Sequence, residues 1–135
     1  MQVISKTYML LLVAGAAFML IWGVAGFFEY FTGIVPGIKL QNDAYPSGVQ
    51  FVHWFLITTA GSVFTFGYFS KWRYTPFAMV ILFSNLGVLC TIQTFDFMSD
   101  QWGVTPYAAE MIGYLIHSTF LMRSALSKAH FGHNT

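Results

Sequence analysis

The sequence predicts an all-α membrane protein, a bundle of four transmembrane helices with both chain termini in the cytoplasm. Hydrophobic residues make up 56% of the chain and charged residues only 8%, whereas a soluble domain carries about 25% charged residues. Four stretches are apolar and long enough to cross a bilayer, because a hydrocarbon core of about 30 Å takes about 20 helical residues. The few charges divide by sign between the two ends of these stretches. We therefore expect a single integral membrane domain over residues 1–135.

The four expected spans follow one another with short connections. They run over residues of about 8–31, 48–70, 75–97 and 106–126. Pro76 and Pro106 stand where the third and fourth helices begin, and a missing N–H costs little at such positions. The stretch 35–47 is rich in Pro, Gly, Asn and Asp, which predicts a loop. Backbone groups in lipid need partners within the chain, so we expect each span to be helical.

The first span is expected to be retained rather than cleaved as a signal peptide. Lys6 and the small residues that follow it, at 14–17, resemble the start of such a peptide. The apolar run nevertheless continues to Phe28, which is longer than a signal-peptide core of about 7–15 residues.

The placement of charge predicts the orientation. The basic residues at the end that holds both termini are Lys6, Lys71, Arg73, Arg123 and Lys128, and Lys39 is at the opposite end. The five acidic residues are all at that opposite end: Glu29, Asp43, Asp96, Asp100 and Glu110. Because basic residues concentrate on the cytoplasmic side, the acidic end is expected to face outward. The membrane is a plasma, inner or organelle inner membrane in this interpretation.

Composition also narrows the partners. The single cysteine, Cys90, excludes an intramolecular disulfide and a CxxC site. The net charge is +1 and the chain has no basic run, so we expect no nucleic-acid partner. The expected partners are the lipid bilayer and other membrane protein subunits. His130 and His133 in the C-terminal tail are expected to face solvent.

Small residues recur on the first two expected helices, at Gly15, Gly23, Gly26, Ala60, Gly61 and Gly67. Small residues let helix backbones approach closely in lipid. Two interpretations remain open, packing within the bundle and packing against a partner subunit.

Each expected helix carries an ionisable side chain into the outer half of the membrane. These side chains are Glu29, His53, Asp96, Glu110 and His117. His53 lies about 7 Å below the start of its helix and His117 about 16 Å below the start of its own. Such groups cost about 2.5–3.5 kcal/mol or more inside a bilayer, so they normally face protein or water. We therefore expect a shared polar pocket.

Several contents of this pocket are compatible with the sequence. The five side chains are candidate metal ligands, because imidazole and carboxylate suit Zn, Cu, Fe or Mn. His53 and His117 are candidate axial ligands of haem b, although their expected depths differ by about 9 Å. Acid–base chemistry by Glu and His on a quinone, lipid or sterol is a third interpretation. In the simplest interpretation, these groups only form hydrogen bonds between helices, and each such bond stabilises the bundle by about 0.6–2 kcal/mol.

The stretch AYPSGVQFVHWF, followed by a short basic turn, is similar in layout to the small helical subunits of copper membrane monooxygenases. The similarity covers one helix and its flanks. It implies that outer-leaflet Asp and His residues bind a metal.

Short loops and aromatic-rich helix faces favour a non-catalytic role. The first hypothesis is a small accessory or structural subunit that packs on the catalytic subunits of a larger membrane complex. That complex would be energy-converting or oxidative, of respiratory, photosynthetic or membrane monooxygenase type. The first alternative is a membrane enzyme or cofactor-binding protein that uses His53, Glu110 and His117 to bind a metal, haem or quinone. The second is a small proton-coupled transporter, in which Glu29 and Glu110 relay protons.

Overall fold

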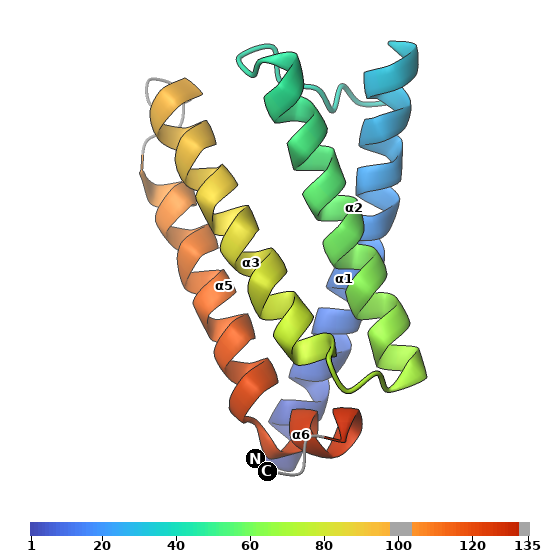
Figure 1. Cartoon of the computed structure of the whole chain (residues 1–135), viewed down its shortest axis with the longest axis vertical. Helices are drawn as coiled ribbons and strands as arrows, with labels where there is room; N and C mark the ends of the chain where they lie inside the picture. Colours follow the sequence, from blue (N-terminus) through green and yellow to red (C-terminus); the bar gives the residue numbers. More distant parts are fainter. Residues whose placement is uncertain (98–103, 133–135) are drawn as a thin grey trace.

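The computed structural model describes residues 1–97 and 104–132, and Asp100 and His133 lie outside the described residues. The described part is built from helices and contains no strand (Figure 1). The α-helices are α1 (Gln2–Thr32), α2 (Ser47–Ser70), α3 (Thr75–Ile92), α5 (Thr105–Arg123) and α6 (Ala125–Phe131). A π-helical turn, η1 (Gln93–Phe97), continues α3. The all-helical class that the sequence predicts is confirmed.

Three helices have the length and apolar composition needed to cross a membrane. They are α1, α2, and α3 together with η1 (Thr75–Phe97). The fourth expected span corresponds to α5, which has 19 residues. We call the end of the helices that carries Lys6 and α6 the basic end, and the end that carries Glu29 and the α1–α2 loop the acidic end.

The fourth expected helix divides in two at Ser124. This residue has extended backbone angles (φ −68°, ψ 139°), and its side chain accepts a hydrogen bond from the Ser127 backbone N–H. A serine in this position is a favourable N-cap, so the chain leaves α5 and starts a new helix. The hydroxyl of Ser127 donates to the Leu121 carbonyl over 2.6 Å, which holds α6 against the end of α5.

The short helix α6 folds back under the basic end. Phe131 is 1% exposed, and it packs edge-to-face on Phe64 of α2. The His130 ring stacks on Tyr68, and its Nε2–H donates to the Tyr68 carbonyl over 2.9 Å. The expectation that His130 faces solvent is wrong, because the turn at Ser124 directs α6 onto α2.

The helices α1 and α2 pack as a close pair through Gly61. A Cβ atom added to Gly61 would lie 2.6 Å from the Leu20 backbone nitrogen and 2.7 Å from the Ala16 carbonyl oxygen. These distances are shorter than any ordinary contact, so the two backbones meet here without an intervening side chain.

Two further glycines extend this contact towards the acidic end. A Cβ atom would lie 2.3 Å from the Trp54 ring at Gly26 and 2.2 Å from Thr58 Oγ1 at Gly23. Trp54 is 2% exposed, so its indole is enclosed between the two helices.

Gly67 lies equally close to Thr75, whose Oγ1 would be 2.0 Å from an added Cβ, and Ala60 is 0% exposed. Gly15 differs, because no atom lies within 4 Å of its Cβ position. Five of the six small residues therefore serve packing within the chain, and Gly15 borders open space.

The helices α1 and α5 meet at the basic end. The Tyr8 hydroxyl and His117 Nδ1 share a hydrogen bond, and the Tyr8 ring packs edge-to-face on Phe120 at a centroid distance of 4.6 Å. Figure 1 shows the two helices separating from this point towards the acidic end, while α3 runs beside both α2 and α5. The separation leaves cavities between α1 and α5.

Candidate functional site

A cavity of about 420 Å³ at the acidic end is the candidate site, and we call it the polar cavity. Its volume falls within the range of about 300–1,000 Å³ that is usual for ligand pockets. Side chains of α1, α2, α3, η1 and α5 line it, together with one residue of the α1–α2 loop. The polar side chains in its wall are Tyr45, His53, Cys90, Gln93, Thr94, Tyr107, Glu110 and Tyr114.

His53 presents a hydrogen-bond donor to this cavity. Its Nδ1 lies 3.1 Å from Nε2 of Gln93, the first residue of η1. An amide nitrogen can only donate, so Nδ1 accepts and the proton of the neutral imidazole is on Nε2. The edge of the His53 ring also contacts Trp54, at a centroid distance of 4.7 Å. Contacts from two elements thus fix both the tautomer and the orientation of the ring.

Glu110 of α5 presents a hydrogen-bond acceptor to the same cavity. Its Oε1 accepts a hydrogen bond from the Tyr114 hydroxyl, one turn later on α5. Its Oε2 accepts from the Cys90 thiol of α3, with an S–O distance of 3.1 Å. Two donors from two helices therefore orient the carboxyl group.

The loop residue Tyr45 closes the acidic end of the cavity. Burial raises the pKa of its hydroxyl, and the electrostatic influence of Cys90 and Glu110 raises it further, against a smaller opposing effect of a hydrogen bond with Asn42. Tyr45 therefore stays a neutral hydroxyl. Its ring packs edge-to-face on Phe97 of η1.

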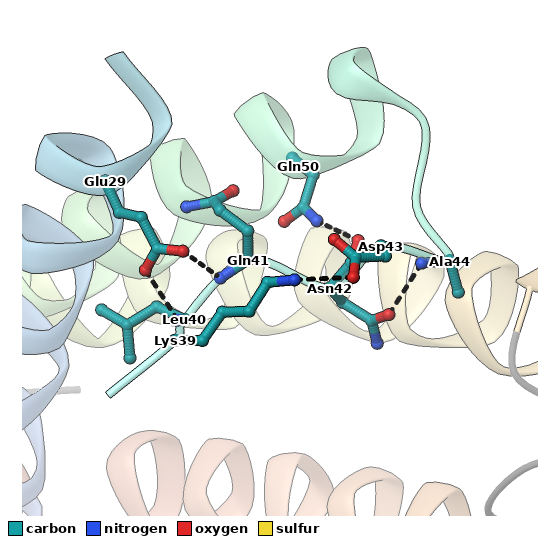
Figure 2. Close-up of polar contacts among 8 residues, drawn as sticks. All are labelled: Glu29, Lys39, Leu40, Gln41, Asn42, Asp43, Ala44 and Gln50. Carbon is teal, nitrogen blue, oxygen red and sulfur yellow. Dashed lines mark hydrogen bonds and ion pairs between the residues drawn. The ribbon is translucent and has the colours of Figure 1, made fainter. Parts of the chain in front are cut away.

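Glu29 lies away from the polar cavity and organises the α1–α2 loop (Figure 2). It is 4% exposed, and its two carboxylate oxygens accept hydrogen bonds from the Leu40 N–H at 2.7 Å and the Gln41 N–H at 3.2 Å. The Gln41 side chain donates to the Gly26 carbonyl over 2.9 Å and accepts from Trp54 Nε1 over 3.1 Å. The carboxylate of Glu29 thus ties the loop to α1 and α2.

Further contacts hold the rest of the loop in place (Figure 2). Lys39 and Asp43 form an exposed ion pair at 2.6 Å. The Asn42 side chain accepts from the Ala44 N–H over 2.9 Å, and the Asn42 carbonyl accepts from the Gln50 side chain. The loop is therefore a fixed wall of the site.

The other two predicted ligands lie elsewhere. Asp96 is an exposed residue of η1 that does not line the polar cavity. His117 lines a second cavity, where its Nδ1 shares a hydrogen bond with the Tyr8 hydroxyl. The structure thus brings His53 and Glu110 together and separates Glu29, Asp96 and His117 from them. Within residues 1–97 and 104–132, no group of three or more His, Cys, Asp and Glu side chains is placed to hold a metal ion.

The site also contains residues that the sequence analysis did not select. Tyr114 follows Glu110 by four residues, a helical spacing that would have indicated their contact. Cys90 is buried, and its thiol donates to Glu110. Tyr45 carries no sequence signal of this kind, because its position depends on the path of the loop.

Comparison of the chain with protein-family models, with curated proteins and with solved structures gives no match.

The role of Glu29 leads to a first prediction. In the Glu29→Gln variant, the remaining carbonyl oxygen still accepts a hydrogen bond from one backbone N–H of the loop. The new NH₂ group faces the other backbone N–H and cannot accept its hydrogen bond. We expect a loss of about 1–3 kcal/mol in the free energy of unfolding, the usual cost of an unsatisfied buried group. Denaturation in detergent micelles measures this loss, and faster tryptic cleavage after Lys39 would report the loosened loop.

The matched control is Asp43→Asn, which breaks only the exposed ion pair with Lys39 and should cost about 0–1 kcal/mol. Equal stability of Glu29→Gln and the wild-type protein would contradict the anchoring role of Glu29.

Proposed function

We propose that the chain is a multi-pass integral membrane protein in which α1, α2, α3 and α5 form a four-helix bundle. The 19 residues of α5 extend about 28 Å at 1.5 Å per residue, close to the bilayer core of about 30 Å. Lys6, Lys71 and Arg123 belong to the basic end, which supports a cytoplasmic position for that end and for both termini.

Labelling of single cysteines tests this topology. Each single cysteine is introduced into a Cys90→Ser background. We expect a membrane-impermeant maleimide to label Lys39→Cys in intact cells. We expect it to label Lys71→Cys only after the cells are permeabilised. Both positions are exposed, so both should react once the membrane is opened. Labelling of Lys71→Cys in intact cells would overturn the orientation.

For the function, we propose that the chain binds a small amphipathic molecule in the polar cavity. One observation carries this proposal: His53 of α2 and Glu110 of α5 line the same cavity, within a predominantly apolar helix assembly. His53 offers an N–H donor and Glu110 a carboxylate acceptor, so the pair suits a ligand with a carbonyl or hydroxyl group. The quinone, lipid and sterol classes have such groups on apolar bodies.

The space between these residues favours a ligand over a purely structural network. Polar groups within a membrane need partners, and Gln93, Tyr114 and Cys90 supply some of them. Helices that packed only to satisfy such groups would close around them, whereas about 420 Å³ remains beside His53 and Glu110. The pair also has the chemistry of an acid and a base, which supports proton exchange with a bound hydroxyl group.

Binding of a quinone with one isoprene unit tests the proposal. Trp22 lines the cavity, so quenching of tryptophan fluorescence in detergent micelles gives the Kd. His53→Leu should weaken binding of the quinone several-fold, because a hydrogen bond between neutral groups contributes about 0.5–1.5 kcal/mol. Glu110→Gln should weaken binding of the reduced quinol about tenfold or more, because the quinol hydroxyl donates to a charged carboxylate and such a bond contributes about 1.5–3 kcal/mol.

Asp96→Asn is the control, because Asp96 is exposed and does not line the cavity. The Kd of this variant should equal that of the wild-type protein. No saturable binding to the wild-type protein, or unchanged binding by both cavity variants, would overturn the proposal.

A second candidate function, a structural subunit of a larger energy-converting or oxidative complex, is supported by α3. Asn85 and Ser84 are exposed near the middle of this apolar helix. Each donates a 2.8 Å hydrogen bond to the carbonyl four residues earlier, but the carboxamide of Asn85 has further bonding capacity. Asn and Ser commonly bond across helices in membranes, so this face suits a helix of a partner subunit.

Native mass spectrometry of the complex extracted from its own membranes tests this candidate. The wild-type chain should carry partner chains, and Asn85→Leu should release most of them because the interhelical bond is lost. Val24→Leu, a conservative change on the exposed face of α1, should keep them. A wild-type chain without partners, or an Asn85→Leu variant that retains them, would exclude this role of α3.

A further inference from the structure

A second cavity adjoins the polar cavity and differs from it in character. It has a volume of about 470 Å³ and lies between α1 and α5 closer to the basic end. Its wall is mainly aliphatic and aromatic, and we call it the apolar cavity. The two cavities share Phe18, Met19 and Tyr114 in their walls. They are therefore neighbouring parts of one cleft.

The apolar cavity contains space that the chain does not fill. Gly15 of α1 lines it, and no atom lies within 4 Å of the Cβ position of this residue. At Gly23, Gly26 and Gly61, by contrast, side-chain or backbone atoms lie within 3 Å of the Cβ position. Gly15 is thus the glycine of α1 that leaves room beside the helix.

The two polar side chains at the end of the apolar cavity nearest the basic end are hydrogen-bonded to each other. They are Tyr8 and His117, and the bond joins the Tyr8 hydroxyl and His117 Nδ1. The other side chains in the wall of this cavity are mainly aliphatic and aromatic. The cleft is therefore polar at the acidic end, at His53 and Glu110, and apolar beside Gly15.

We propose that the two cavities form one binding site for a long-chain molecule of the quinone or quinol class. Its oxygen-bearing ring lies between His53 and Glu110, and its apolar chain runs beside Gly15 towards Tyr8. The position of the ring rests on the proposed function, whereas the path of the chain rests on the apolar cavity. The cleft lies between α1 and α5, so such a chain enters from the membrane between these helices.

Two quinones that differ only in chain length test the path of the chain. The Kd of the wild-type protein is measured for a quinone with one isoprene unit and for one with four. Gly15→Leu fills the apolar cavity without a backbone clash, since its Cβ meets no atom within 4 Å. We expect it to weaken binding of the four-unit quinone about tenfold or more, the factor that corresponds to two methylene groups left unburied. Binding of the one-unit quinone should change by less than about twofold, a difference of under half a kcal/mol.

Ile21→Phe is the matched control, because it adds bulk at a position of α1 that is 71% exposed and lines neither cavity. Both quinones should bind it as they bind the wild-type protein. Leu11→Trp narrows the apolar cavity from an exposed position and replaces Gly15→Leu if that variant does not fold.

The outcomes separate the two proposals. Selective loss of the four-unit quinone supports the path beside Gly15. Equal effects of Gly15→Leu on both quinones, or no effect on either, overturn this path and leave the ring site in place. Failure of the wild-type protein to bind either quinone overturns the proposed function itself, and the path with it.

Discussion

The backbone contact between α1 and α2 is the constraint on which the rest of the structure depends. At Gly61 the two helices meet without an intervening side chain, and the Trp54 indole occupies the space that Gly26 leaves. Because α1 is held this closely to α2, its axis follows α2 and it does not lie along the length of α5. As a result α1 reaches α5 at Tyr8 and then separates from it. The cleft between α1 and α5 is the geometric consequence of this pairing.

The α1–α2 loop keeps the same pair together at the acidic end. Glu29 binds two consecutive backbone N–H groups of the loop, and Gln41 connects the Gly26 carbonyl to the Trp54 indole. The packing of Trp54 and the path of the loop are therefore coupled through one residue. Because Tyr45 belongs to this loop, the wall of the polar cavity depends on a carboxylate that does not itself reach the cavity.

The sequence was sufficient to predict the helices, and it was less informative about their neighbours. Long apolar runs and prolines at helix starts indicated α1, α2 and α3, because a helix in lipid has few alternatives. The break at Ser124 was missed, since the apolar pattern continues through it while the cap acts locally. Helical spacing shows which residues share a face of a helix, but it does not show which other helix that face contacts. The predicted set of ligands therefore combined His53 and Glu110 with three residues that lie elsewhere in the structure. Glu29 was taken for a possible ligand because its real partners are backbone groups, which no sequence pattern displays.

The unequal lengths of α1 and α5 have a mechanical consequence. At 1.5 Å per residue, the 31 residues of α1 extend about 46 Å and the 19 residues of α5 about 28 Å. In a bilayer, the longer helix meets this hydrophobic mismatch by tilting, and its tilt decreases as the bilayer thickens. The angle between α1 and α5 sets the width of the cleft, and α1 is joined to α5 at Tyr8. In the membrane position proposed above, a change in bilayer thickness would therefore change the tilt of α1 about its contact with α5 at Tyr8, and the width of the cleft would depend on lipid composition.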